Sequence, residues 1–91
     1  MVKQEFRVGK ALFKDARGAA QLVNLCSKLR SRILLVVQGD YIDCRSILGL
    51  LQLKLFSGER FVVQCSGEDE AEALALLTDF FAASGNSAAN L

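Results

Sequence analysis

The spacing of apolar residues changes repeatedly along this 91-residue chain, and these changes limit the folds that it can form. Residues 32–38, 41–44 and 60–66 alternate in polarity or are rich in β-branched side chains, as half-buried strands are. Residues 16–29 and 69–81 instead repeat apolar side chains at helical spacing. The chain is therefore expected to combine short strands with two longer amphipathic helices.

Two shorter elements complete this pattern. Residues 3–8 place Phe6 and Val8 on one face of a strand, and Ser46 precedes a short apolar segment over residues 47–53. The resulting order of strands and helices is βαββαβα. We expect an α+β domain in which a four-stranded antiparallel sheet carries its helices on one face.

Length and charge narrow the class of protein. We predict one domain over residues 1–83 and a flexible tail over residues 84–91, because that tail is small and polar. The net charge is +1 without a block of one sign, so no nucleic-acid or anionic membrane partner is expected. The N-terminus lacks a signal-peptide pattern, and no segment approaches the roughly 20 apolar residues of a membrane span. We expect a cytoplasmic protein.

The three cysteines do not form a metal-binding pattern. Cys26, Cys44 and Cys65 are widely spaced, and the chain has no histidine to complete a zinc site. Each falls at a position expected to face the core, so we predict buried free thiols, with no metal and no cofactor.

Three local motifs occur at the spacing of one bacterial family. They are Asp15-Ala16-Arg17-Gly18-Ala19-Ala20, Arg45-Ser46-Ile47-Leu48-Gly49-Leu50-Leu51 and Gly67-Glu68-Asp69-Glu70, the last of which opens the final helix with Asp69 and Glu72 at capping-box spacing. With the order of elements, they make the chain resemble HPr, the histidine-containing phosphocarrier of the bacterial sugar phosphotransferase system, over about residues 2–83. The resemblance implies an open-faced β-sandwich and no enzymatic activity of its own.

The first motif departs from the family at its reactive position. Asp15 occupies the position of the family's phosphohistidine, Gly18 replaces a proline and Phe13 replaces a glycine. A relay through an imidazole cannot operate in this form. Within the family the chain is most similar to the Crh group, the catabolite-repression HPr of bacilli, which also lacks this histidine and keeps the regulatory serine.

Asp15 has three interpretations. It is an ordinary N-cap of the helix that follows, a fixed negative charge imitating the phosphorylated carrier, or an acceptor of phosphate. The start of a helix favours an anion, and Arg17 with Gly18 would bind one there. The anion that Arg17 contacts is either a phosphate group or Asp15 itself.

Ser46 has two interpretations. It caps a short helix and does nothing more, or it is the site of regulatory phosphorylation beside an exposed apolar set formed by Ile47, Leu48 and Leu51. The resemblance implies HPr kinase/phosphorylase and a transcriptional regulator as protein partners in the second case.

Alternation along the strands also exposes apolar side chains on the open face of the sheet. Leu34, Val36, Tyr41 and Val62 are expected there, which suggests a contact surface for a homodimer or another protein. The leading functional hypothesis is a non-catalytic regulatory or adaptor protein related to the phosphotransferase system. The alternatives are a phosphocarrier that uses Asp15, and a diverged protein-interaction subunit outside sugar transport.

Overall fold

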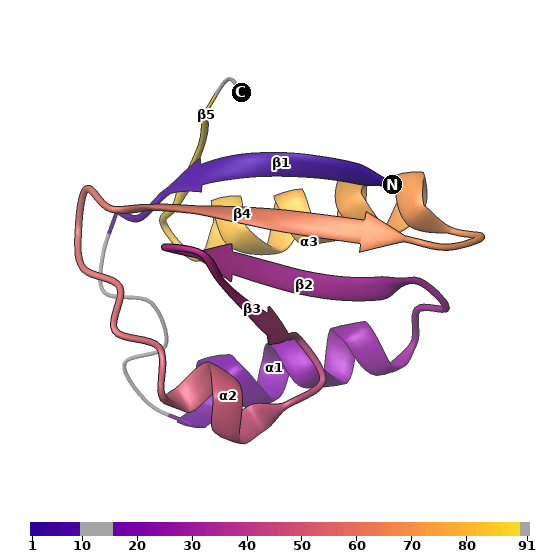
Figure 1. Cartoon of the computed structure of the whole chain (residues 1–91), viewed down its shortest axis with the longest axis horizontal. Coiled ribbons are helices and arrows are strands. Elements are labelled where there is room, and N and C mark those ends of the chain that lie inside the picture. The colour runs from indigo at the N-terminus through magenta and orange to yellow at the C-terminus, as the bar shows by residue number, and fades with distance from the viewer. Residues whose placement is uncertain (10–15, 90–91) are drawn as a thin grey trace.

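The computed structural model describes residues 1–9 and 16–89. The elements, drawn in Figure 1, are β1 (Val2–Arg7), α1 (Ala16–Ser27), β2 (Arg32–Val37), β3 (Asp40–Asp43), α2 (Ile47–Leu51), β4 (Arg60–Ser66), α3 (Glu70–Ala83) and β5 (Ser87–Ala89). The predicted order is confirmed as far as α3. In the described part of the chain, no helix has the length and apolar character needed to cross a membrane.

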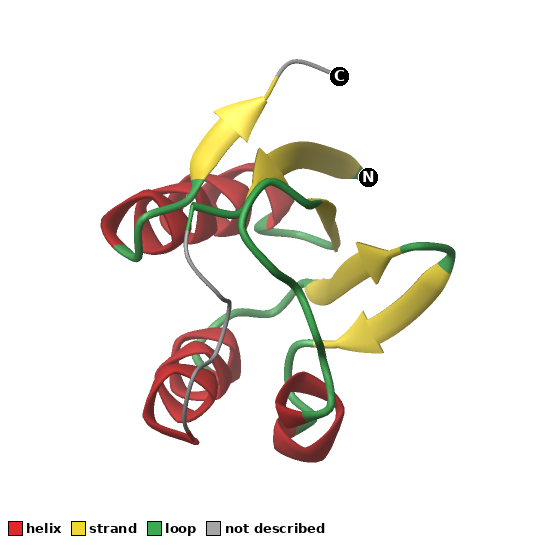
Figure 2. Ribbon diagram, turned by 90° about the vertical axis from the view of Figure 1, so that its left-hand side faces the viewer, coloured by secondary structure: helices red, strands yellow, loops and turns green. Residues whose placement is uncertain are grey.

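The strands form one antiparallel sheet in the order β3-β2-β4-β1-β5. All three helices lie on one side of it, and in Figure 1 α3 passes behind β4 while the other face of the sheet points toward the viewer. Figure 2 shows the same separation from the side, with helices and strands in different layers. The predicted α+β class with an open sheet face is confirmed.

The expected number of four strands is wrong, because the end of the chain adds a fifth. Gly85, at φ 92°, turns the chain back after α3, and Asn86 is buried with its backbone N–H and its Nδ2 both donating to the carbonyl of Phe81, at 3.1 Å each. Ser87–Ala89 then pairs with the free edge of β1. The expected tail over residues 84–91 thus contains a strand, although its flexibility stays a prediction.

The core lies between the inner face of the sheet and the helices. Phe6, Phe61 and Phe81 meet at its centre with ring centroids 5.1–5.4 Å apart, bringing β1, β4 and α3 together. Each fully buried phenylalanine contributes about 1.5–3 kcal/mol. The alternation that sends Leu34, Val36, Tyr41 and Val62 to the open face sends their neighbours inward, and these are buried or half-buried. They are Ile33, Leu35, Val37, Ile42, Cys44, Phe61, Val63 and Cys65.

Asp69 joins two loops at one end of the sheet instead of capping its own helix. Its carboxylate accepts hydrogen bonds from the backbone N–H groups of Arg30 and Ser31, both at 2.9 Å, and from the Ser31 hydroxyl. It makes no side-chain cap bond to α3, so the expected capping box is wrong. The Arg30 N–H, followed by the Ser31 hydroxyl, lowers the pKa of Asp69 below its usual value.

A close backbone approach explains this use of Asp69. Gly67, at φ 152°, lies so near Ser31 that a Cβ at position 67 would come within 2.8 Å of the Ser31 Cα. The loop before β2 and the turn after β4 therefore touch directly, which puts Asp69 within reach of the N–H groups beside it.

Candidate functional site

The motif around Asp15 falls only partly within the described structure. Asp15 and Phe13 lie outside the described residues, so all three interpretations of Asp15 stay predictions. The described α1 begins at Ala16, which puts Arg17 and Gly18 in its first turn. Arg17 is exposed and Gly18 is half-buried, while the helix is held to the core by Ala19, Leu22 and Cys26 at helical spacing.

Ser46 is the N-cap of α2, as the sequence predicts. Its backbone is extended, at φ −98° and ψ 100°, and its Oγ accepts a hydrogen bond of 3.2 Å from the Gly49 N–H. Its carbonyl accepts from the Leu50 N–H at 3.0 Å. The residue itself is exposed, so its hydroxyl is open to an incoming protein.

Arg45, the residue before Ser46, anchors the chain to the end of α1. Its Nη2 donates to the carbonyls of Cys26, Leu29 and Ser31 at 3.0, 2.7 and 3.2 Å, just beyond and within the end of α1. A guanidinium at a helix C-terminus satisfies carbonyls that have no partner within the helix and interacts favourably with its dipole. The Arg45 side chain therefore binds the C-terminal end of α1 and the loop after it.

Three apolar side chains of α2 project from the molecule. Leu48 is 70% exposed, Leu51 41% and Ile47 38%, whereas Leu50 on the opposite side of the helix is fully buried. We call Ile47, Leu48 and Leu51 the α2 patch. Its predicted exposure is confirmed, and its role as a docking surface stays a prediction.

The start of α1 lies beside the end of α2. The helices α1 and α2 pack side by side and run in opposite directions, so the first turn of α1 and the last turn of α2 lie at the same end of the pair (Figure 1). Arg17 and Gly18, in the first turn of α1, therefore lie at the same end of the helix pair as the last turn of α2.

Phe56 is an exposed apolar residue that the sequence analysis missed. It is 62% exposed in the loop after α2, while the adjacent Leu55 is buried. In extended backbone, neighbouring side chains point to opposite sides, so the adjacent Leu55 and Phe56 are a signal that could have indicated one exposed residue. Which of the two faces outward depends on the path of the loop.

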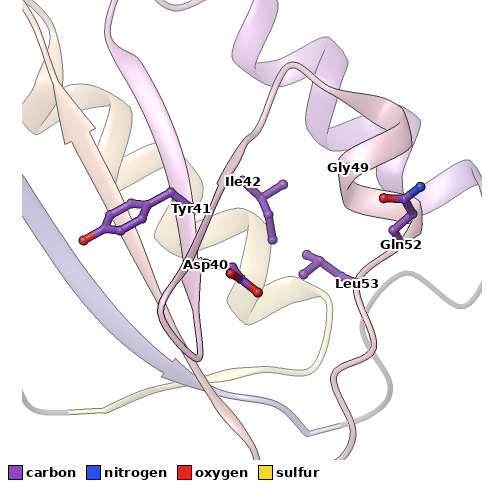
Figure 3. A pocket seen from close by; sticks show the side chains of 6 residues that line it. All are labelled: Asp40, Tyr41, Ile42, Gly49, Gln52 and Leu53. Atoms are coloured by element: carbon purple, nitrogen blue, oxygen red, sulfur yellow. The ribbon is translucent and has the colours of Figure 1, made fainter.

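A hollow of about 390 Å³ lies between β3 and α2. Its lining, shown in Figure 3, consists of Asp40, Tyr41, Ile42, Gly49, Gln52 and Leu53. A Cβ at position 49 would lie 3.1 Å from the Ile42 Cγ2 and 3.2 Å from the Ser46 Oγ, so a glycine lets this short helix approach β3 closely. The lining holds one carboxylate and no nucleophile paired with a base, which gives no arrangement for catalysis.

The cysteines are structural. All three are free and fully buried, as predicted, and burial raises the pKa of the Cys65 thiol to about 11. A hydrogen bond with Cys26, followed by burial, raises the pKa of Cys44. Within the described residues, no group of three or more histidine, cysteine or carboxylate side chains could hold a metal ion.

The open face of the sheet carries the four predicted apolar side chains in adjoining rows. Tyr41, Val36, Val62 and Glu5 are cross-strand partners in one row, which we call the tyrosine row. Asp43, Leu34, Gln64 and Lys3 form the next row, which we call the lysine row. Tyr41 is 64% exposed, and the three aliphatic side chains are half-buried by their neighbours.

Known proteins share both the sequence pattern and the fold. The model of the family described as "PTS HPr component phosphorylation site" matches residues 2–83. The phosphocarrier protein HPr of Xylella fastidiosa is 33% identical, with 89% of this chain and 91% of that protein aligned. The crystal structure of HPr-C-His from Thermoanaerobacter tengcongensis matches with a TM-score of 0.76 and 28% identity, covering 87% of this chain and 89% of its own.

A relative that differs from these phosphocarriers in name is also similar. The HPr-like protein Crh of Bacillus subtilis is 32% identical, with 88% of this chain and 94% of Crh aligned. A crystal structure of Crh, described as a dimer with a swapping domain, matches with a TM-score of 0.69, covering 81% of this chain and 83% of its own. On the match of 82 of its 91 residues to the family model and on these relatives, the chain belongs to the HPr family of the bacterial phosphotransferase system.

Proposed function

We propose that this chain is a non-catalytic HPr-like regulatory or adaptor protein that is switched by phosphorylation of Ser46. The observation that carries the proposal is the position of Ser46, whose exposed hydroxyl stands at the start of α2 directly before the α2 patch. A phosphorylatable group beside an exposed apolar surface can change which protein binds there.

The chemistry of phosphate explains how such a switch would work. A phosphoserine adds about 1.5 to 2 negative charges, which the positive end of the helix dipole at the start of α2 favours. The helix itself is held by the buried Leu50 and by the three carbonyl contacts of the preceding Arg45. The expected result is a changed surface charge beside Leu48 without refolding.

The missing imidazole argues against the carrier role of the family. HPr passes phosphate through a histidine, and this chain has none. Similarity to Crh, a relative named as HPr-like and not as a phosphocarrier, supports a regulatory role instead.

Incubation with HPr kinase/phosphorylase and ATP tests the proposal. The intact protein should gain one phosphate, detected by mass spectrometry, and the modified peptide should contain Ser46. Ser46→Ala should abolish the gain, while Ser27→Ala should leave it unchanged, because Ser27 is exposed at the far end of α1. Label that persists in Ser46→Ala would contradict the assignment.

Partner binding provides the second readout. Leu48→Ala and Leu51→Ala should weaken binding to a transcriptional regulator of the kind that the family contacts, with phosphorylation of Ser46 itself retained. Equal binding of the phosphorylated and unphosphorylated forms would leave Ser46 as a helix cap only.

The second candidate function is a phosphocarrier that uses Asp15 as the acceptor. Incubation with the general phosphotransferase enzyme and labelled phosphoenolpyruvate separates the two, since an acyl phosphate on Asp15 is sensitive to hydroxylamine. We expect no such label. A third candidate, a protein-interaction subunit outside sugar transport, is favoured by the apolar rows of the open sheet face and predicts neither modification.

A further inference from the structure

We propose that a second copy of this chain covers the open face of the sheet, with the twofold axis parallel to the strands. This inference is independent of any role of Ser46. Two such sheets packed face to face would form a closed β-sandwich, in which the apolar side chains of both copies lie between the layers.

The pattern of charges makes the open face complementary to itself. In the lysine row, an acidic residue of β3 and a basic residue of β1 stand at opposite ends, with Leu34 and Gln64 between them. An axis parallel to the strands and midway between β2 and β4 lays β3 of one copy over β1 of the other. Asp43 of each copy then faces Lys3 of the other copy.

The tyrosine row gives matching contacts under the same operation. Val36 of one copy lies over Val62 of the other, so the aliphatic centre of the face is paired with itself. Tyr41 lies over Glu5, where the phenol can donate a hydrogen bond to the carboxylate. This arrangement places no two like charges of the two rows against each other.

A second twofold arrangement is disfavoured by the same residues. An axis perpendicular to the strands and centred on the tyrosine row would put Glu5 over Glu5 and Lys3 over Arg7, which follows Glu5 on the outer face of β1. Like charges in direct opposition weaken association and select against the wrong register. The charges therefore disfavour this register. An axis perpendicular to the strands and midway between the two rows would instead pair Glu5 with Lys3 and leave Asp43 over Tyr41, so Asp43→Lys would not weaken that dimer and separates it from the proposed one.

The area of the open sheet face limits the affinity of the proposed dimer. Four strands spaced about 4.8 Å apart, each with about six residues rising about 3.3 Å, present a face of roughly 400 Å², or roughly 800 Å² for both copies. Specific interfaces begin near 1,200 Å². We therefore expect a weak dimer that forms at hundreds of micromolar protein and dissociates on dilution.

A pair of charge reversals tests the register. Lys3→Asp and Asp43→Lys each place two like-charge pairs in the symmetric dimer, so each variant alone should associate at least about tenfold more weakly than the wild type. Mixed one to one, the two variants should form a heterodimer of near wild-type affinity, because every pair is again opposite in sign. Sedimentation equilibrium from 10 µM to 1 mM measures all of these against the monomer mass of 9.9 kDa.

Controls keep the outcome decisive. Glu72→Lys, exposed on the helical side, should not change association. Because Asp43 also accepts a hydrogen bond of 2.8 Å from the Arg45 N–H, circular dichroism should accompany Asp43→Lys. If that variant does not fold, Lys3→Glu and Val36→Lys alone must still reduce dimerisation.

Three results would overturn the proposal. The first is a wild type that is monomeric at 1 mM. The second is a dimer unaffected by Lys3→Glu and Val36→Lys, as expected for exchange of a segment between copies. The third is a mixture of folded Lys3→Asp and Asp43→Lys that associates no better than either variant alone.

Discussion

At the scale of single residues, a buried thiol makes the stability of the folded protein depend on pH in the alkaline range. Cys65 lies on β4 under the helices with no exposed surface, and burial disfavours its thiolate. In the unfolded chain the same thiol titrates near its ordinary pKa of 9.0, whereas in the folded protein its pKa is about 11. Alkali therefore favours the unfolded state through this residue.

We predict that Cys65 makes the protein less stable as the pH rises from about 9 to about 11. Its contribution is fully present below the unfolded pKa and is lost as the pH passes through the raised folded pKa. Urea unfolding between pH 8 and pH 11 should show this decline. Cys65→Ala should make the decline shallower, leaving the part due to Cys44, and should lower stability at pH 8 through the cavity that it leaves. Parallel curves for the two proteins would contradict the assignment to Cys65.

Residue-level features of the candidate site differ in how far the sequence predicts them. The N-cap at Ser46 and the exposed α2 patch follow from local spacing, so both positions could be predicted. The hydrogen bonds of Arg45 could not be predicted, because its three carbonyl acceptors belong to α1 and the loop after it, 14 to 19 residues earlier. The exposure of Phe56 depends on the course of a loop in the same way.

At the scale of elements, Asp69 links the start of β2 to the start of α3. The Asp69 carboxylate, when ionised, accepts three hydrogen bonds from Arg30 and Ser31. The neighbouring Glu70 closes the turn by accepting from the Gly67 N–H at 3.3 Å. The Arg30 N–H is the largest influence that lowers the pKa of Asp69.

We predict that Asp69 contributes to acid sensitivity. A carboxyl with a lowered folded pKa stabilises the protein above its unfolded pKa of about 3.8, and this stabilisation is lost as the pH falls through the folded value. Asp69→Asn should lower stability at pH 7 and make it less dependent on pH between 4 and 2. Asp79→Asn, an exposed change on the same helix, is the control. An unchanged acid transition in Asp69→Asn would exclude this role.

The helices and strands differ in how far the sequence predicts them. Long periodic segments such as α1, β2, β4 and α3 follow from their own spacing, because each buries one regular face. The short β5 has no period to detect, and its place is determined by the edge of β1, by Gly85 and by the buried Asn86. Capping at Asp69 was wrongly predicted for a similar reason, since its partners come from a distant loop.

At the scale of the whole molecule, β5 covers the edge of β1 that a four-stranded sheet would leave unpaired. Besides the backbone pairing of β1 and β5, Gln4 Nε2 donates to the Ala89 carbonyl at 2.7 Å. Unpaired strand edges are sites of pairing between chains, so covering one also limits association through β1. The described sheet thus ends in β3 on one side and in β5 on the other.

We predict that removing residues 85–91 destabilises the protein by about 1–3 kcal/mol, because the hydrogen bonds of Asn86 and of β5 are lost while the main core is kept. Amide hydrogen exchange should become faster in β1, measured by mass spectrometry. A chain of equal length with a Gly-Ser sequence in place of residues 85–91 controls for the new terminus. If β1 exchanges as slowly as in the full chain, β5 does not stabilise it.

Gly9 and Gly85 form a sequence pattern that indicates whether a chain of this family can add the fifth strand. A Cβ at position 9 would overlap the carbonyl oxygen of Gly85, while Gly85 itself needs a positive φ of 92° to turn the chain toward β5. A side chain at the first position or a β-branched residue at the second would keep the chain from closing along β1. Among homologues that extend a few residues past the last helix, glycine at both positions should therefore mark those that can add the fifth strand, and a search for paired glycines would sort them before any of their folds is determined.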